Sequence, residues 1–177
     1  VTSIGACAFN ATGLTSVTIG DGVTSIGDDA FCYCRDLTSV TIGSSVTSIG
    51  DDAFKGCERL VEVINKSSLT ITKGSSDNGG VAYYALEVHN GESKIGQVDE
   101  YIFYKSDAGS FLVSYIGTDR ELVLPEDYCG EKYAINQYAF YTIEDSRDDE
   151  AYIVSVSIPD NVTSIGYYAF YNCSGLT

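Results

Sequence analysis

A repeat of about 23 residues constrains this chain more than any other feature of its sequence. Residues 1–22 read VTSIGACAFNATGLTSVTIGDG, residues 23–45 read VTSIGDDAFCYCRDLTSVTIGSS, and residues 46–68 read VTSIGDDAFKGCERLVEVINKSS. The VTSIG motif returns at residue 162. A fixed period of this length indicates stacked structural units rather than a globule. We therefore expect the chain to wind into a solenoid.

The apolar residues recur at the same places in every copy. In the first three copies they are Val1, Ile4, Phe9, Leu14, Val17 and Ile19; Val23, Ile26, Phe31, Leu37, Val40 and Ile42; and Val46, Ile49, Phe54, Leu60 and Val63. One copy is too small to bury these side chains alone, but stacked copies can bury each against its equivalent in the next. We predict a continuous core in which Phe31 and Phe54 are buried and touch.

Two short strands and a turn are expected in each copy. The stretch TSVTI alternates polar and apolar residues, which indicates a half-buried strand with Val17 and Ile19 pointing inward. The stretch VTSI favours a second strand, ended by a glycine that permits a turn conformation denied to other residues. The aspartate pairs at 28–29 and 51–52 are suited to cap a single turn of helix.

The unit VTSIG..AF..C..LTSVTI resembles the leucine-rich repeats of the BspA-like bacterial surface proteins, which are related to the Treponema-type repeat. The resemblance is close over residues 1–65 and 162–177 and loose over 120–160. It implies an α/β repeat fold, a right-handed curved solenoid rich in strands with short helical turns. It also implies a place at the cell surface or in the secreted fraction, and adhesion to host proteins or to other cells. It does not imply one shared ligand.

The period is lost between residues 66 and 120, which predicts an insert. Asp77-Asn78 and Gly91 are start and stop signals for a short amphipathic helix. One face of this helix would carry Val81, Tyr84, Ala85 and Val88. The segments YIFYK and SFLVSYIG, separated by Ser-Asp-Ala-Gly, predict a β-hairpin. We therefore expect one continuous solenoid with repeats at 1–65, an insert at 66–120, and degenerate then regular repeats at 121–177.

The degenerate repeat is recognised by spacing. Leu122 and Leu124 in ELVLP stand where Val17 and Ile19 stand in the first copy, and Pro125 ends the strand. The spacing of Ile26, Ala30 and Phe31 is repeated further on by Ile135, Ala139 and Phe140. This predicts about five coils, one of them enlarged by the insert.

Charge argues against two classes of partner. The formal net charge is −15, which disfavours nucleic acid and anionic membrane surfaces because both are bound through Lys and Arg. No stretch approaches the roughly 20 apolar residues of a spanning helix, so no membrane insertion is expected. The chain opens without Met inside one repeat, shows no signal peptide, and ends inside another repeat. We expect it to be a piece of a longer array.

The cysteines are expected to be structural. Cys34, Cys57 and Cys173 share one repeat position with Thr12 and Ile143, and such a position needs a small or apolar buried side chain. A buried thiol is therefore favoured over a disulfide or a metal ligand. No repeated position accounts for Cys7, Cys32 and Cys129.

Catalytic and metal chemistry find little support. His89 is the single histidine, and we expect it on the surface at the end of the predicted helix, without a nucleophile beside it. Stacked aspartates at 28–29 and 51–52 could hold Ca²⁺, but capping and solubility are favoured. No cofactor and no catalytic residue is assigned. A calcium-dependent, polysaccharide-active solenoid is the third-ranked alternative.

The leading hypothesis is a non-catalytic, adhesion-type module that binds a protein or glycan on a host or neighbouring cell. Its contact surface would be the outward strand face, made of Ser16, Thr18, Ser39, Thr41, Glu62, Ile64, Ser155 and Ser157. Alternative anchors on the hairpin are Tyr101, Tyr104 and Tyr115, because aromatic residues often dominate interface energy. The acidic loop with Glu144, Asp145, Asp148, Asp149 and Glu150 is expected to be solvated, or to attract a basic partner. The second hypothesis is a stiff spacer that holds another domain away from the cell surface.

Overall fold

The computed structural model describes residues 1–141 and 153–177. The chain divides into two compact units, unit 1 (Val1–Lys94) and unit 2 (Ile95–Thr177), and each is described by itself. The acidic loop and the repeat position of Ile143 lie outside the described residues.

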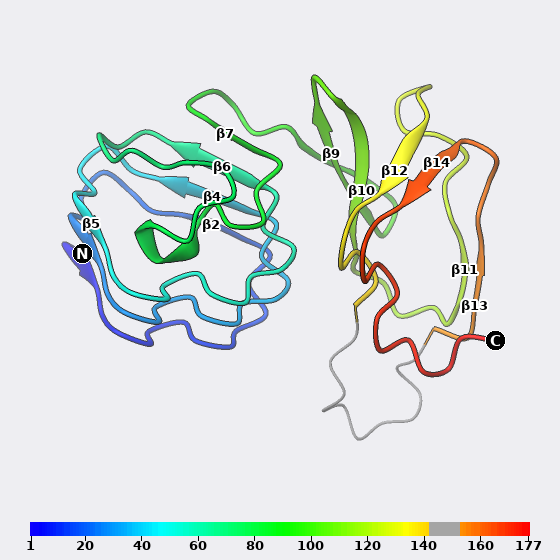
Figure 1. Cartoon of the computed structure of the whole chain (residues 1–177), viewed down its shortest axis with the longest axis horizontal. Helices are drawn as coiled ribbons and strands as arrows, with labels where there is room; N and C mark the ends of the chain where they lie inside the picture. Colours follow the sequence, from blue (N-terminus) through cyan, green and yellow to red (C-terminus); the bar gives the residue numbers. More distant parts are fainter. Residues whose placement is uncertain (142–152) are drawn as a thin grey trace. The chain divides into compact units, whose positions relative to one another are not determined.

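Unit 1 is a stack of coils built on two parallel sheets (Figure 1). The first sheet has the order β1 (Ser3–Ile4), β3 (Ser25–Ile26) and β5 (Ser48–Ile49). The second has the order β2 (Ser16–Thr18), β4 (Ser39–Ile42), β6 (Glu62–Asn65) and β7 (Glu87–His89). The register joins equivalent residues of successive coils: Val17 pairs with Val40 and Val40 with Val63. Each coil therefore completes the sheets of its neighbours.

A ladder of stacked phenylalanines fills the interior of unit 1. The ring centroids of Phe9 and Phe31 are 5.1 Å apart, with 5° between the ring planes. Phe31 and Phe54 follow at 5.0 Å and 14°. Their exposed fractions are 0% for Phe31 and 1% for Phe54. The predicted like-on-like core is confirmed.

The turns that follow VTSIG are not helical, so the predicted single helical turn is wrong. Two residues in each of these turns lie in the left-handed region instead. In the second coil they are Asp29 (φ 55°) and Tyr33 (φ 58°). The aspartates have another role as well, since Asp28 Oδ1 accepts a hydrogen bond at 3.0 Å from the backbone N–H of Asp51 in the next coil. Turn residues are thus held by neighbouring coils, not by a local helix.

The predicted helix at 77–91 is also wrong. The helical element in this segment is a short 3₁₀ turn, η1 (Asn78–Gly80), and Glu87–His89 forms strand β7 beside β6. Val81, Ala82 and Ala85 are buried in the core of unit 1. The apolar residues of this segment are spaced as on one side of a helix because successive tight turns direct their side chains into the same core. Residues 66–94 therefore form a fourth, irregular coil.

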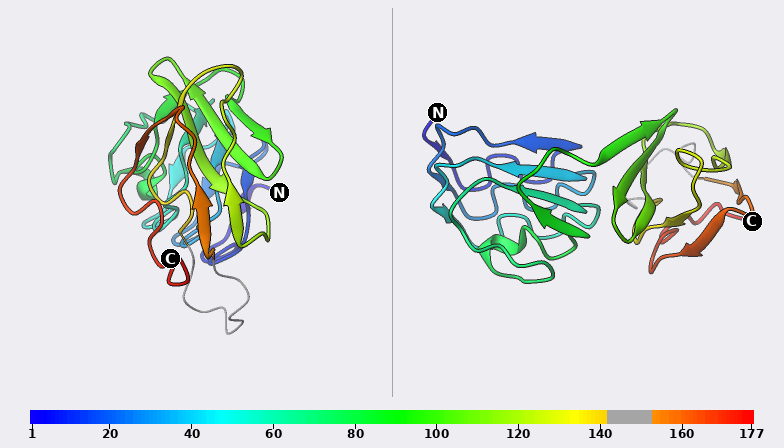
Figure 2. Two further views of the ribbon diagram at one scale, coloured as in Figure 1. Left: turned by 90° about the vertical axis from the view of Figure 1, so that its right-hand side faces the viewer. Right: turned by 90° about the horizontal axis from the view of Figure 1, so that it is seen from above.

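Unit 2 has a five-stranded sheet with the order β14 (Val162–Ile165), β12 (Tyr133–Ile135), β10 (Gly109–Tyr115), β9 (Tyr101–Ser106) and β8 (Ile95–Val98) (Figure 2). β9 and β10 pair antiparallel around residues 106–109, where the hairpin is predicted. β10 also pairs in parallel with β12, as equivalent strands of successive coils do. The hairpin is therefore an integral part of this sheet.

The degenerate repeat packs as its spacing predicts. β11 (Glu121–Val123) pairs in parallel with β13 (Ser155–Ser157), and Leu122 and Leu124 are buried. Phe140 stacks on Phe170 with ring centroids 4.7 Å apart and 3° between the ring planes. The core of unit 2 thus contains the same phenylalanine contact as the core of unit 1.

The glycine of VTSIG is required by close approach between coils. A Cβ built on Gly27 would lie 2.6 Å from the backbone N of Ala6 in the preceding coil. The corresponding distances are 2.6 Å from Gly50 to Asp28 N and 2.6 Å from Gly166 to Gln137 N. None of these three glycines has a positive φ, so the conformational reason expected from the sequence is wrong. A side chain at this position would push the coils apart.

Replacing Gly50 by alanine is expected to lower the free energy of unfolding by about 2 kcal/mol, the usual cost of overpacking a close contact. Gly5 is the matched control, because a Cβ there meets no atom within 4 Å. Urea denaturation of Gly50→Ala and Gly5→Ala measures the difference. Equal midpoints for the two variants would contradict the role given to this glycine.

Candidate binding surfaces

The outward strand face is partly as predicted. In unit 1, Ser16 and Thr18 on β2 are exposed, while Ser39 and Thr41 on β4 are half-buried. In unit 2, Ser155 and Ser157 on β13 are exposed. The apolar positions turn inward, as Val40 does between Ser39 and Thr41 and Ile19 does after Thr18. The exposed strand face therefore offers small hydroxyl groups in rows.

Glu62 and Ile64 are not part of an exposed face, so their assignment to the outward surface is wrong. Their exposed fractions are 0% and 6%. Segment 89–94 covers Glu62: its carboxylate accepts hydrogen bonds from Ser93 Oγ at 2.6 Å and from the backbone N–H of Lys94 at 2.6 Å. A buried carboxylate needs such donors, because burying an unpaired charge is costly. The loop after β7 thus closes this part of the sheet.

His89 belongs to the same cluster and is not a helix-terminal surface residue. It lies on β7 with a side chain only 13% exposed, and its Nε2 is 3.2 Å from Glu62 Oε1. Its Nδ1 accepts the backbone N–H of Gly91 at 3.1 Å, which leaves Nε2 to face the Glu62 carboxylate. Ser93 donates to the carboxylate rather than to the histidine. The cluster therefore fixes the loop and does not form a serine–histidine relay.

Two hairpin tyrosines hold unit 2 together, so their assignment as surface anchors is wrong. Tyr104 is completely buried, and Tyr101 is 8% exposed with its hydroxyl donating to the carbonyl of Val123 at 3.1 Å. Tyr115 is half-buried and donates to Glu100 Oε2 at 3.1 Å. Burial, with the nearby carboxylates, raises the pKa of Tyr115 to about 12. The Tyr115 hydroxyl group therefore remains protonated at neutral pH, and the three side chains serve packing.

Three cysteines form a repeated contact between coils. Cys34 Sγ donates to the carbonyl of Phe9 at 3.0 Å, and Cys57 and Cys173 repeat the contact with the phenylalanine of the preceding coil at 3.2 and 3.1 Å. All six cysteines, which lie within the described residues, are free thiols. Burial raises the pKa of Cys57 well above its usual range. This repeat position therefore holds buried thiols.

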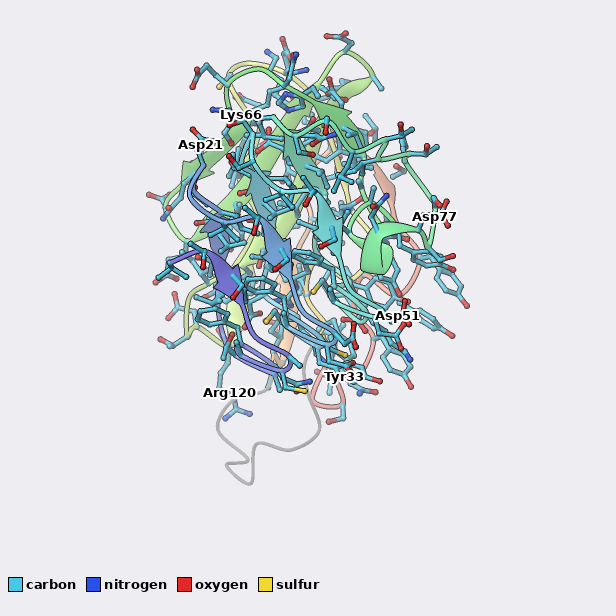
Figure 3. The ribbon with its side chains drawn as sticks, turned by 90° about the vertical axis from the view of Figure 1, so that its left-hand side faces the viewer. Asp21, Tyr33, Asp51, Lys66, Asp77 and Arg120 are labelled. Atoms are coloured by element: carbon cyan, nitrogen blue, oxygen red, sulfur yellow. The ribbon has the colours of Figure 1, made fainter. Side chains whose placement is uncertain are left out.

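The paired aspartates do not converge on a common point. Asp28 binds a backbone N–H of the next coil, and Asp52 pairs with Lys55 at 2.8 Å. Figure 3 shows Asp51 and Tyr33 at the turn end of unit 1, opposite Asp21 and Lys66. Within residues 1–141 and 153–177, no three His, Cys, Asp or Glu side chains are grouped as metal ligands. These carboxylates act in turns and in surface pairing.

A cluster of aromatic side chains, three exposed and two half-buried, lies on the turns of unit 2. We call it the tyrosine patch; its members are Tyr138, Tyr141, Tyr167, Tyr168 and Tyr171. Ring centroids are 3.9 Å apart for Tyr167–Tyr168, 4.8 Å for Tyr168–Tyr171 and 5.7 Å for Tyr138–Tyr168. The exposed fractions of Tyr167, Tyr168 and Tyr171 are 68%, 42% and 48%. No other group of the described residues gathers so much exposed aromatic surface.

The sequence carries a signal for the tyrosine patch in its repeat alignment. Tyr167-Tyr168 aligns with Ala6-Cys7 in the first copy and with the aspartate pairs in the next two. Positions that accept alanine and aspartate face solvent, so tyrosines there are exposed.

Stacked coils with ladders of equivalent residues define a solenoid repeat protein. The family description "BspA type Leucine rich repeat region" matches residues 1–109 and 134–177 in six copies. The chain belongs to this family, as its repeat motif predicts. No curated protein matches the chain. In the described part of the chain, no helix has the length and apolar character needed to cross a bilayer.

Two solved structures are similar to the chain. One is a leucine rich cell surface protein from Faecalibacterium prausnitzii A2-165, with 23% identity and a TM-score of 0.41. The other is a leucine-rich repeat protein from Eubacterium ventriosum ATCC 27560, with 24% identity and a TM-score of 0.36. The matches cover 100% and 99% of this chain but 64% and 56% of those chains. The chain thus spans less than two thirds of either relative.

Replacing Glu62 by alanine is expected to destabilise unit 1 by about 3 kcal/mol, because buried donors lose their acceptor. Ser39→Ala is the matched control: Ser39 is the register partner of Glu62 on β4, and its change should stay within about 0.5 kcal/mol. Urea denaturation measures both variants. A small effect of Glu62→Ala would show that segment 89–94 is not held by this carboxylate.

Brief labelling of the native chain with N-ethylmaleimide is expected to modify Cys7 and Cys129, which are exposed, and to spare the four buried thiols. The physical reason is that labelling requires an accessible thiolate, and burial withholds both access and ionisation. Peptide mass spectrometry identifies the modified residues, and unfolding in urea should release all six. Fast modification of Cys57 in the native chain would contradict the buried ladder.

Proposed function

We propose that this chain is a non-catalytic binding module of a bacterial cell-surface or secreted protein, and that it holds a macromolecule of a host or neighbouring cell. Adhesion is the role that fits this activity. The ligand is a protein or a glycan. Family membership supports the surface location, and the similar protein from Faecalibacterium prausnitzii is itself described as a leucine rich cell surface protein.

The observation that carries the proposal is that the backbone of each turn is constant while its side chain varies. The seventh residue counted from the start of each repeat, or its structural equivalent, has φ between 51° and 58° in six coils. The residues there are Cys7, Asp29, Asp52, Asn78, Tyr138 and Tyr168. A scaffold that keeps its shape while surface residues change is suited to recognition.

The exposed strand faces are proposed as additional contact area. Ser16 and Thr18 in unit 1, and Ser155 and Ser157 in unit 2, present hydroxyl groups on regular strands. Small polar residues of this kind supply complementarity around stronger anchors rather than most of the binding energy. The half-buried Ser39 and Thr41 would contribute less.

The spacer is the second candidate function. It is favoured by the plain chemistry of the strand face, where exposed residues of β2 and β13 are only serine and threonine. A spacer requires length and stiffness but no ligand. The two functions therefore differ in whether the chain binds cells by itself.

Cell binding by the full chain separates these functions. Fluorescent beads that carry the chain are expected to be retained on epithelial or bacterial cell layers several times more than beads carrying an unrelated protein of equal net charge. Flow cytometry or microscopy counts the retained beads. Retention no greater than that of the unrelated protein would refute the binding module and leave the spacer.

The strand-face contribution needs its own variant. Lysines at Ser16, Thr18, Ser155 and Ser157 are expected to reduce retention, because long charged side chains block close approach. The control places four lysines at other exposed serines: Ser3, Ser48, Ser164 and Ser174. An equal effect of both variants would show that charge, not the strand face, is responsible.

A further inference from the structure

We propose that the tyrosine patch of unit 2 is a docking surface for a cationic segment of a partner protein, one that presents arginine or lysine side chains. The proposal rests on the proposed binding function and assigns it a surface and a class of partner.

Folding does not require tyrosines at these positions. Position 6 of the repeat, which is Tyr167 in the last copy, holds Ala6, Asp28 and Asp51 in the first three copies. Position 10, which is Tyr171 in the last copy, holds Asn10, Cys32 and Lys55. The first three coils form the same turns without any aromatic residue at these two positions. The tyrosines are therefore additions to a fold that is complete without them.

Two of the tyrosines are also placed against local conformational preference. Tyr138 and Tyr168 have φ of 58° and 55°, in the left-handed region. Asp and Asn tolerate this region well, whereas a bulky side chain there is strained. The chain uses aspartate or asparagine at the equivalent positions 29, 52 and 78. Strained residues of this kind are common at functional sites.

The patch is ordered before a partner arrives. Tyr141 stacks on Tyr171 with centroids 5.8 Å apart and 12° between the ring planes, and Tyr168 contacts three other rings. Tyrosine gives a large contact area with few rotatable bonds, and rings already packed lose little freedom on binding. Covering the exposed rings with a partner therefore costs little side-chain entropy.

Charge and ring geometry favour a cation. The net charge of −15 attracts basic partners and repels anionic ones. Tyrosine faces attract guanidinium and ammonium groups, and unit 1 contains such a contact, with Arg35 Cζ 5.4 Å from the ring centroid of Tyr33.

The angles between the rings argue against a sugar. The ring of Tyr168 is tilted by 47°, 45° and 56° against Tyr167, Tyr138 and Tyr171. Tilted rings expose faces in several directions. They do not form the single flat platform on which a neutral sugar ring would lie.

The test uses a peptide of four Arg-Gly-Ser repeats, a matched peptide with glutamine in place of arginine, and neutral hexaoses of glucose and mannose. The patch variant carries Tyr138→Asn, Tyr167→Ala, Tyr168→Asn and Tyr171→Asn. Each replacement is a residue type that the chain itself uses at that position, and none changes the charge. Thermal unfolding of this variant should occur no lower than that of the original chain, since asparagine relieves the left-handed strain.

Titration calorimetry is expected to show that the original chain binds the arginine peptide. The affinity should fall at least tenfold when the patch variant replaces the original chain, and at least tenfold when the glutamine peptide replaces the arginine peptide. The control variant, Tyr83→Asn with Val123→Asn, removes exposed apolar side chains elsewhere and should change the affinity less than twofold. Equal affinity of the original chain and the patch variant would overturn the proposal. Binding of a hexaose that depends on the patch, without arginine binding, would overturn it in favour of a glycan.

Retention of beads on cells tests the tyrosine patch and the binding function separately. If beads with the original chain and beads with the patch variant are retained equally, the patch is not the docking surface, although the chain is still a binding module. If the original chain is not retained, the binding function itself fails. A selective loss in the patch variant supports both.

Discussion

Hydrogen bonds and side-chain contacts between equivalent residues of successive coils hold each unit together. In unit 1 the pairing of Val17, Val40 and Val63 sets the register, and the stacked rings of Phe9, Phe31 and Phe54 follow from it. The short strands of one coil could not persist alone, because each backbone group finds its partner in the neighbouring coil. The thiol of Cys34 and the carboxylate of Asp28 take part in the same pattern of contacts between coils.

This constraint divides the sequence into positions that are fixed and positions that are free. Gly50 is fixed because the backbone of the preceding coil lies where its side chain would be. Turn residues such as Asp52 and Tyr168 are fixed in conformation but free in chemistry, since their side chains point away from the interior and share a positive φ. The chemistry of the surface can therefore change from copy to copy while the core remains the same, and the tyrosine patch occupies such turns rather than strands.

The repeat made the core and the outward positions of β2 and β13 predictable, because like residues in phase must stack. It could not predict the fourth coil, whose Val81 and Ala85 imitate a helix face while lying in successive turns. Nor could it predict the burial of Glu62: the covering residues, Ser93 and Lys94, come from a segment without repeat spacing. The left-handed turns were missed because aspartate is equally suited to cap a helix and to adopt a positive φ.

The fourth coil has a consequence for how such arrays change in length. Asn78 is the left-handed residue of this coil, and Gly79 and Gly80 stand where other coils have alanine and phenylalanine, so the ring ladder of unit 1 stops at Phe54. The second and third copies, in contrast, present nearly the same residues to the coils that precede and follow them. Recombination between these near-identical segments could add or delete a whole copy without creating a new interior contact, whereas the irregular fourth coil would be kept as a boundary.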